Sequence, residues 1–299
     1  MLFWRHCGIV CAWDGDAFLD QIILPVKSDV IFAIYFADER NIEFLTDFLK
    51  SALPIPVDDY DEVTIIDPRL IREFPEDKLG IVDVKLRLKS GKIIHIELQV
   101  APLPYMAKRI TYYDSKMITE QIGKSEDYEE IQQVITIAIT EKEFIPNSPS
   151  YHHRFTMYDC VNGVELTDIV EVHTLELCKL LPEMDNSRLD IWMRFIKAEE
   201  ASELEAIAQK DPLIKKAVAR LMELSADEKA RLLYEKREKE RMDAQVLERA
   251  ARAEGEKAGQ KAKAIQIAKS LLALGVPIDT IIAATGLTSA EVEKLRDAK

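Results

Sequence analysis

Residues 81–100 read IVDVKLRLKSGKIIHIELQV, and this segment determines how the sheet of the predicted fold is built. Apolar and polar residues alternate on both sides of Ser90-Gly91, and this period of two is typical of β-strands. Each of the two strands therefore has one apolar face and one polar face. The polar faces carry Asp83, Lys85 and Arg87 on the first strand, and His95, Glu97 and Gln99 on the second.

The pairing of the two strands follows from their apolar faces. Both apolar faces lie on the same side of the sheet only if the two residue numbers of each directly opposed pair add up to an even number. The loop between the strands must then contain an odd number of residues. A three-residue loop, Lys89-Ser90-Gly91, meets this condition, with Gly91 in the left-handed conformation. This register places Asp83 opposite Glu97, with their β-carbons about 5 Å apart.

Two carboxylates that face each other repel unless a positive charge lies between them. Oxygen ligands this close suit Mg²⁺ or Mn²⁺, which can polarise a phosphoryl oxygen and produce hydroxide from bound water. Gln99, on the same face, can hydrogen-bond the water or a phosphate but adds no charge, so Lys85 is the candidate for a supporting cation. The alternative is a solvated sheet face on which Lys85 and Arg87 simply neutralise the two carboxylates.

The segments around this hairpin predict helices packed on a sheet. A helix follows Ser28, and a second runs from Asn41 to the prolines after residue 53. Residues 63–67 and 134–140 have strand character, and the second segment is apolar enough to be buried on both sides. Asn162-Gly163 predicts a tight hairpin between 154–159 and 164–172. These elements predict an α/β fold with a mixed sheet that is flanked by helices and ends in an antiparallel edge.

The last third of the chain is predicted to be helical. Residues 201–264 are rich in Glu, Lys, Arg and Ala, and we interpret them as a charged spacer or a weak coiled coil. Residues 265–299 regain a core pattern, with two short helices around Thr285-Gly286 that resemble a helix-turn-helix unit. The last helix has as many acidic as basic residues, so base reading is not expected of it. Dimerisation through the C-terminal helices is the favoured alternative role.

The charge distribution and the spacing of the cysteines limit the functional classes to which the protein can belong. The net charge is −13, and the acidic excess lies in the first two thirds, which argues against strong nucleic-acid affinity there. The four cysteines form no CxxC pair and no Cys/His cluster, so we expect reduced thiols in a cytoplasmic protein rather than a zinc site or disulfides. Residues 1–24 are interpreted as an N-terminal extension, without a signal peptide or a membrane span.

Three blocks, in a fixed order, resemble one known family. They are KSDVIFAIYFADERNIEFLTDFL (27–49), IIDPRLIREFPEDKLGIVDVKLRLKSGKIIHIELQ (65–99) and YMAKRITYYDSKMITEQIGKSEDYEEIQQVITIAI (105–139). Together they resemble the PD-(D/E)XK nuclease family transposases, also called the Rpn family of recombination-promoting nucleases. The similarity covers most of residues 25–200, and it implies a restriction-endonuclease-like fold and metal-dependent cleavage of DNA.

The resemblance also assigns roles to residues. Asp83 and Glu97 match the two signature acidic residues, Gln99 matches the residue two positions beyond, and Asp29 matches the acidic position of the first helix. The wider superfamily usually carries a lysine at the position of Gln99, where it positions water and steadies developing charge. Relatives of this particular type often carry glutamine there.

The sequence therefore leads to two hypotheses. The first is a Mg²⁺- or Mn²⁺-dependent DNA endonuclease of the transposase type, in which Asp83 and Glu97 bind the metal, Gln99 orients water or phosphate, and Asp29 assists. Candidate DNA contacts are Lys85, Lys108 and Arg109. The second is a catalytically inactive DNA-binding or assembly protein that retains the nuclease fold. The expected parts are an extension (1–24), a nuclease-like domain (25–200), a spacer (201–264) and a helix-turn-helix-like unit (265–299).

Overall fold

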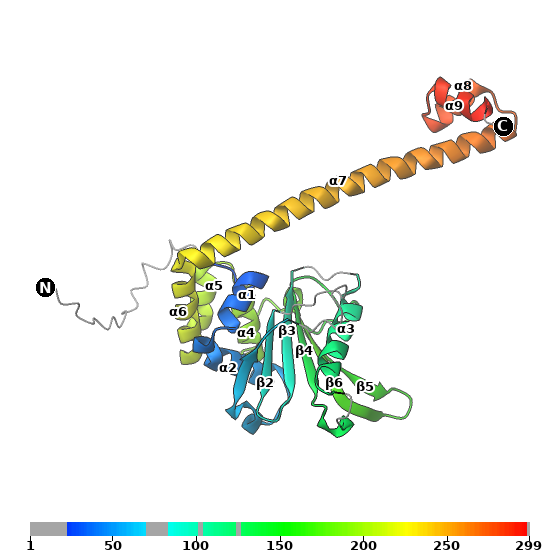
Figure 1. Ribbon diagram of the computed structural model, residues 1–299. Coiled ribbons are helices and arrows are strands. Elements are labelled where there is room, and N and C mark those ends of the chain that lie inside the picture. Colours follow the sequence, from blue (N-terminus) through cyan, green and yellow to red (C-terminus); the bar gives the residue numbers. More distant parts are fainter. Residues whose placement is uncertain (1–22, 70–82, 101–103, 124–126, 298–299) are drawn as a thin grey trace. The chain divides into compact units, whose positions relative to one another are not determined.

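The computed structural model of the protein describes residues 23–69, 83–100, 104–123 and 127–297. Within these ranges the strands form one six-stranded sheet in the order β1-β2-β3-β4-β6-β5 (Figure 1). The strands are β1 (Val63–Ile66), β2 (Val84–Leu88), β3 (Ile93–Gln99), β4 (Val134–Thr140), β5 (His152–Asp159) and β6 (Val164–Glu176). Strands β3, β4 and β6 are parallel to one another, while β1, β2 and β5 are antiparallel to their neighbours. The expected mixed α/β sheet and its antiparallel edge are confirmed.

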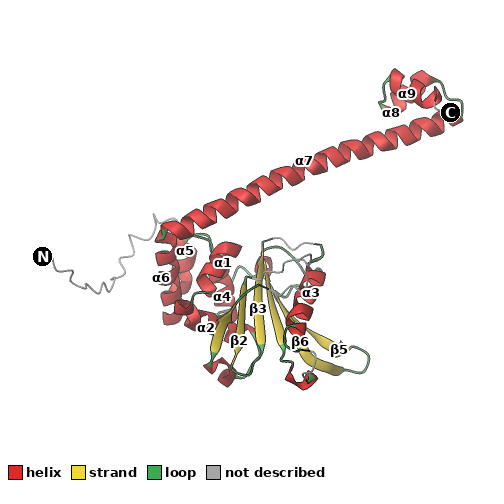
Figure 2. Cartoon of the chain, in the orientation of Figure 1, coloured by secondary structure: helices red, strands yellow, loops and turns green. Residues whose placement is uncertain are grey.

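Helices cover both faces of the sheet (Figure 2). Helix α3 (Met106–Thr119) connects β3 to β4 and packs on one face. The other face is covered by α1 (Asp29–Phe36), α2 (Ile42–Ala52) and α4 (Arg188–Lys197). Because helices lie on both sides, all seven residues of β4 are buried, as the apolar run 134–140 predicts. Short 3₁₀ turns occur at Glu39–Asn41, Val57–Asp61, Tyr128–Glu130 and Leu177–Lys179.

Aromatic side chains form the centre of the larger core. Tyr35, Phe36, Phe48, Trp192 and Phe195 are fully buried, and their rings contact one another at centroid separations of 4.7–6.4 Å within a group that also includes Phe32 and Phe44. Trp192 Nε1 also donates a hydrogen bond to Asp47 at 2.7 Å, which ties α4 to α2. This cluster supports the face of the sheet opposite α3, while the α3 face combines smaller apolar clusters with buried polar residues.

The β2–β3 hairpin has the register that the sequence predicts. Val84 pairs with Ile96 and Arg87 pairs with Ile93, so the same register continued by one residue places Asp83 opposite Glu97. Gly91 has a φ of 91° and closes the three-residue loop, in which its N–H donates to the Leu88 carbonyl at 2.9 Å. The two apolar faces thus remain together, and the carboxylates lie on the opposite face with α3.

Two further helices extend this core beyond residue 200. Helix α5 (Ala201–Ala208) and helix α6 (Pro212–Ala226) contribute buried residues such as Leu204, Ile214 and Val218 to the main core. The compact unit accordingly reaches Tyr234, well past the residue at which the sequence places the end of the nuclease-like domain. At the other end, Leu24 is buried and its N–H donates to Ser225 Oγ at 3.0 Å. The remainder of the expected extension, residues 1–22, lies outside the described residues.

Residues 235–299 form a separate compact unit. Helix α7 (Glu228–Ala273) is continuous where the sequence predicts a spacer followed by a new helix, and its residues 239–263 are all exposed. The end of α7 packs with α8 (Ile278–Thr285) and α9 (Ser289–Asp297) around Ala268, Ile281, Leu287 and Val292. No helix in the described ranges combines the length and the apolar character needed to cross a membrane.

The hairpin loop provides a test of the register. A Cβ at position 91 would require a positive φ in an L-residue and would approach Gln132 Cγ to 3.0 Å. Gly91→Ala should therefore lower the free energy of unfolding by about 1–2 kcal/mol. Ser90→Ala, at the exposed neighbouring position, is the control and should change it by less than about 0.5 kcal/mol. Urea unfolding measures both, and equal stabilities of the two variants would contradict the loop conformation.

Candidate active site

Three acidic residues that the sequence singles out come from three adjoining elements. Glu97 lies near the end of β3 and is only 5% exposed, and Asp83 immediately precedes β2. Asp83 Oδ2 accepts a hydrogen bond from the Leu98 N–H at 2.6 Å, which fixes the carboxylate against β3. Asp29 is the first residue of α1, and its charge acts on Asp83 together with that of Glu97.

Burial and mutual repulsion perturb these carboxylates. Burial, reinforced by the negative charges of Glu97 and Asp29, raises the pKa of Asp83 to about 7. The Leu98 N–H and Arg109 act in the opposite direction but are weaker than the burial effect. Burial also raises the pKa of Glu97, although Arg109 lies against it. A carboxylate pair that resists ionisation in this way is a common feature of functional sites.

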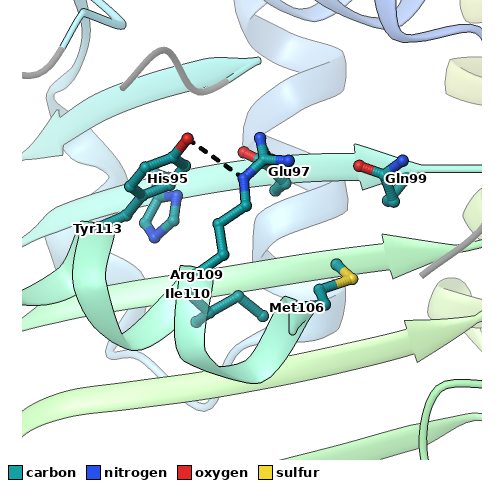
Figure 3. Close-up of a pocket in the computed structure, with 7 residues that line it drawn as sticks. All are labelled: His95, Glu97, Gln99, Met106, Arg109, Ile110 and Tyr113. Carbon is teal, nitrogen blue, oxygen red and sulfur yellow. Dashed lines mark hydrogen bonds and ion pairs between the residues drawn. The ribbon is translucent and has the colours of Figure 1, made fainter. Parts of the chain in front are cut away.

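The cation next to this pair is Arg109, on α3. One Nη atom of its guanidinium forms an ion pair with Glu97, and its Nε donates to the Tyr113 hydroxyl at 3.2 Å (Figure 3). The guanidinium also lies over the Tyr113 ring, 5.1 Å from the centroid. The sequence predicts Arg109 only as a DNA contact, whereas the structure places it directly against a predicted metal ligand.

The remaining candidate residues lie at different distances from this centre. Gln99 is partly exposed at the end of β3 and lines the same small pocket as Glu97 and Arg109 (Figure 3). Lys85 is almost completely buried, and its ammonium pairs with Glu120 at 3.1 Å instead of with the carboxylate pair. Lys108 is exposed on α3. The sequence-based expectation that Lys85 supplies charge to the site thus has no support from this geometry.

A buried polar cluster beside the site was not anticipated. His95, Asp114 and Thr136 are each at most 1% exposed. Asp114 Oδ1 accepts a hydrogen bond from Thr136 Oγ1 at 2.5 Å and lies 2.9 Å from His95 Nε2. The cluster joins α3 to β3 and β4 and so fixes the helix that carries Arg109. An aspartate adjoining the apolar stripe of α3 was the available signal, but its two partners come from strands that only the fold brings together.

The donor set fits a divalent cation. Glu97 Oε2 is buried and has no hydrogen-bond partner among the described residues, and it lies beside a second carboxylate. The described residues contain no group of three or more His, Cys, Asp or Glu side chains arranged to hold a metal. Mg²⁺ commonly binds through one or two carboxylates and completes its octahedron with water, so the two residues that would hold such an ion are Asp83 and Glu97.

Comparisons with known proteins identify family models that match two parts of the chain. The family model described as PD-(D/E)XK nuclease family transposase matches residues 26–251, a range that contains all four sequence-predicted site residues. A second family model, the C-terminal helix-turn-helix domain of the Rpn/YhgA-like nuclease family, matches residues 261–297. Searches of curated proteins and of solved structures found no significant match.

The raised pKa of Asp83 predicts an unusual pH dependence of stability. The folded protein retains a proton on Asp83 that the unfolded chain loses above about pH 4, so this residue makes stability fall between about pH 4 and pH 7. In chelator at pH 8, Asp83→Asn should therefore be more stable than wild type by about 1–3 kcal/mol, allowing for partial exposure, and the gain should vanish near pH 4.

Asp38 provides a control, because its contribution to stability depends on pH in the opposite direction. A hydrogen bond from Arg40 lowers the pKa of Asp38 to about 2, so its contribution is present above about pH 4 and is lost as the pH falls toward 2. Asp38→Asn should thus be less stable than wild type at pH 8. Urea unfolding at a series of pH values measures both variants, and a parallel profile for Asp83→Asn and wild type would show that Asp83 ionises normally.

Proposed function

This chain belongs to the PD-(D/E)XK nuclease family transposases, and on that basis we propose that it is a divalent-metal-dependent DNA endonuclease of the transposase type. The observation that carries the proposal is the carboxylate pair, in which Glu97 keeps one buried oxygen without a hydrogen bond and Asp83 has a raised pKa. A pair of this kind is costly to the folded protein unless a cation compensates for it.

Each residue has a distinct role in the proposed reaction. Asp83 and Glu97 would bind Mg²⁺ or Mn²⁺, which supplies Lewis-acid polarisation of the phosphate and an activated water when bound. The amide of Gln99 would orient that water or a phosphate oxygen by hydrogen bonding. Asp29 would add negative charge next to Asp83. Lys108, exposed at the start of α3, would contact the DNA backbone and position the substrate without reading sequence.

The C-terminal unit would add DNA affinity. It is a helix-turn-helix domain, and such domains are built to bind DNA. Its last helix carries Lys294 and Arg296 together with Glu291, Glu293 and Asp297, so we propose backbone attachment rather than base recognition. Self-association through the C-terminal helices and a cytoplasmic location are further proposals, and the first would involve exposed apolar residues of α7 such as Met242, Val246 and Leu247.

A second candidate function rests on Gln99 and on Arg109. The residue at the usual lysine position is neutral, and the guanidinium of Arg109 compensates the charge of Glu97. A DNA-binding protein that has lost catalysis would show both features. It would retain DNA in a gel-shift assay and would gain no thermal stability from Mg²⁺ or Mn²⁺.

Plasmid cleavage distinguishes the two functions. Purified wild-type protein should nick or linearise supercoiled DNA in Mg²⁺ or Mn²⁺ but not in chelator. Asp83→Asn and Glu97→Gln should each lower the rate at least about 100-fold, because each removes a charged metal ligand. Asp38→Asn, which removes a carboxylate outside the site in the same way, should retain the wild-type rate within about threefold.

The pattern of residual activity separates the possible outcomes. Equal nicking by wild type and both site variants would indicate a contaminating nuclease and would remove the assignment of Asp83 and Glu97. Retention of DNA by the wild type with no cleavage in either metal would favour the inactive alternative.

A further inference from the structure

The proposed site lacks a positive charge at the position where the superfamily usually places a lysine. Gln99 is neutral, and the ammonium of Lys85 is held by Glu120 at 3.1 Å in an almost completely buried pair. Lys108 is exposed to solvent on α3. Among the described residues, Arg109 is the cation for which the structure records an ion pair with one of the two proposed metal ligands.

Arg109 is held in a defined position rather than loosely attached. Tyr113, one helical turn further along α3, is 6% exposed, accepts a hydrogen bond from Nε and supports the guanidinium with its ring. The helix itself is fixed to the sheet by the buried contact of Asp114 with His95 and Thr136. A side chain supported in this way loses little conformational entropy when it binds an anion.

The guanidinium retains capacity for a ligand. Its side chain is 29% exposed, so part of Arg109 lies at the protein surface, and it adjoins Gln99 in the lining of the same pocket. The contacts with Glu97 and Tyr113 use two of the five N–H donors that a guanidinium carries. The remaining donors form the planar fork that suits phosphate oxygens.

We propose that Arg109 supplies from helix α3 the phosphate-facing positive charge that is missing at Gln99, and that Glu97 alternates between Arg109 and the metal ion. This inference rests on the proposed nuclease function. In the structure, the guanidinium of Arg109 compensates the charge of Glu97. With Glu97 holding a metal ion, the guanidinium would be left to donate to the substrate phosphate, where it would stabilise the charge that develops during cleavage. Arg109 is thus both a competitor of the metal and a contributor to the reaction.

These two roles predict opposite effects of a single substitution. Arg109→Gln should bind Mn²⁺ roughly 3- to 10-fold more tightly at pH 8, because the competing charge beside Glu97 is gone. The same variant should cleave DNA about 100- to 1,000-fold more slowly at saturating Mn²⁺, because one charge-stabilising donor is lost. Mn²⁺ binding is measured on DNA-free protein by the electron paramagnetic resonance signal of the free ion, and cleavage is measured in single turnovers.

Three further variants separate this role from a structural one. Tyr113→Phe removes only the Nε contact and should slow cleavage by a few fold with unchanged Mn²⁺ affinity. Arg109→Lys keeps the positive charge and should leave the Mn²⁺ affinity close to that of wild type. Its cleavage rate should lie between those of wild type and Arg109→Gln, because an ammonium lacks the planar set of N–H donors of a guanidinium. Arg40→Gln, which breaks an ion pair with Asp38 between two residues that do not line the pocket, is the matched control and should change neither quantity.

The outcomes are distinguishable from a failure of the proposed nuclease function. If wild type binds Mn²⁺ but cleaves no DNA, the proposed function fails, while the affinity measurement still tests the exchange at Glu97. Unchanged or weaker Mn²⁺ binding by Arg109→Gln overturns the exchange. Cleavage by that variant within about threefold of wild type overturns the role of Arg109 toward the phosphate.

Discussion

The arrangement of the catalytic unit depends on one electrostatic constraint, which is the withdrawal of Asp83 and Glu97 from solvent on the same face of the sheet. Like charges that are close together in a medium of low polarity raise each other's pKa and destabilise the ionised form. Three features reduce this electrostatic cost. The Leu98 N–H donates to Asp83, the guanidinium of Arg109 pairs with Glu97, and the raised pKa of Asp83 keeps that carboxyl partly protonated. None of these contacts uses Glu97 Oε2, which therefore remains available to a cation.

Helix α3 connects this constraint to the rest of the fold. The helix brings Arg109 to Glu97, and it is attached to the sheet by apolar contacts and by a second buried polar group, Asp114. Such a group is stabilising only when its partners are present, because an unpaired buried carboxylate is expensive. His95 and Thr136 provide those partners from β3 and β4. The position of Arg109 is consequently set by interactions five residues away, on the side of the helix that faces the sheet.

The sequence predicts the hairpin register well because the apolar faces allow only loops of odd length, and a three-residue loop with Gly91 at positive φ selects one register among these. It fails for Lys85, since a period of two assigns a side chain to a face but does not show which helix covers that face. Glu120, at the end of α3, takes Lys85 away from the carboxylates. Helices α5 and α6 are a different case. Their apolar spacing was readable from Leu204 and Ile214, but the highly charged composition of 201–264 as a whole concealed it.

The neutral residue at position 99 is consistent with a cation supplied from α3. A lysine there, together with Arg109, would place two positive charges against the carboxylate pair and would compensate it almost completely in the absence of metal. The electrostatic attraction for a divalent ion would then be weak, because that attraction comes from uncompensated negative charge. With Gln99, one guanidinium faces Asp83, Glu97 and the nearby Asp29, so a negative excess remains. A single guanidinium on the helix lies within reach of the carboxylate and, in the proposed reaction, of the phosphate as well, so one cation can serve both groups.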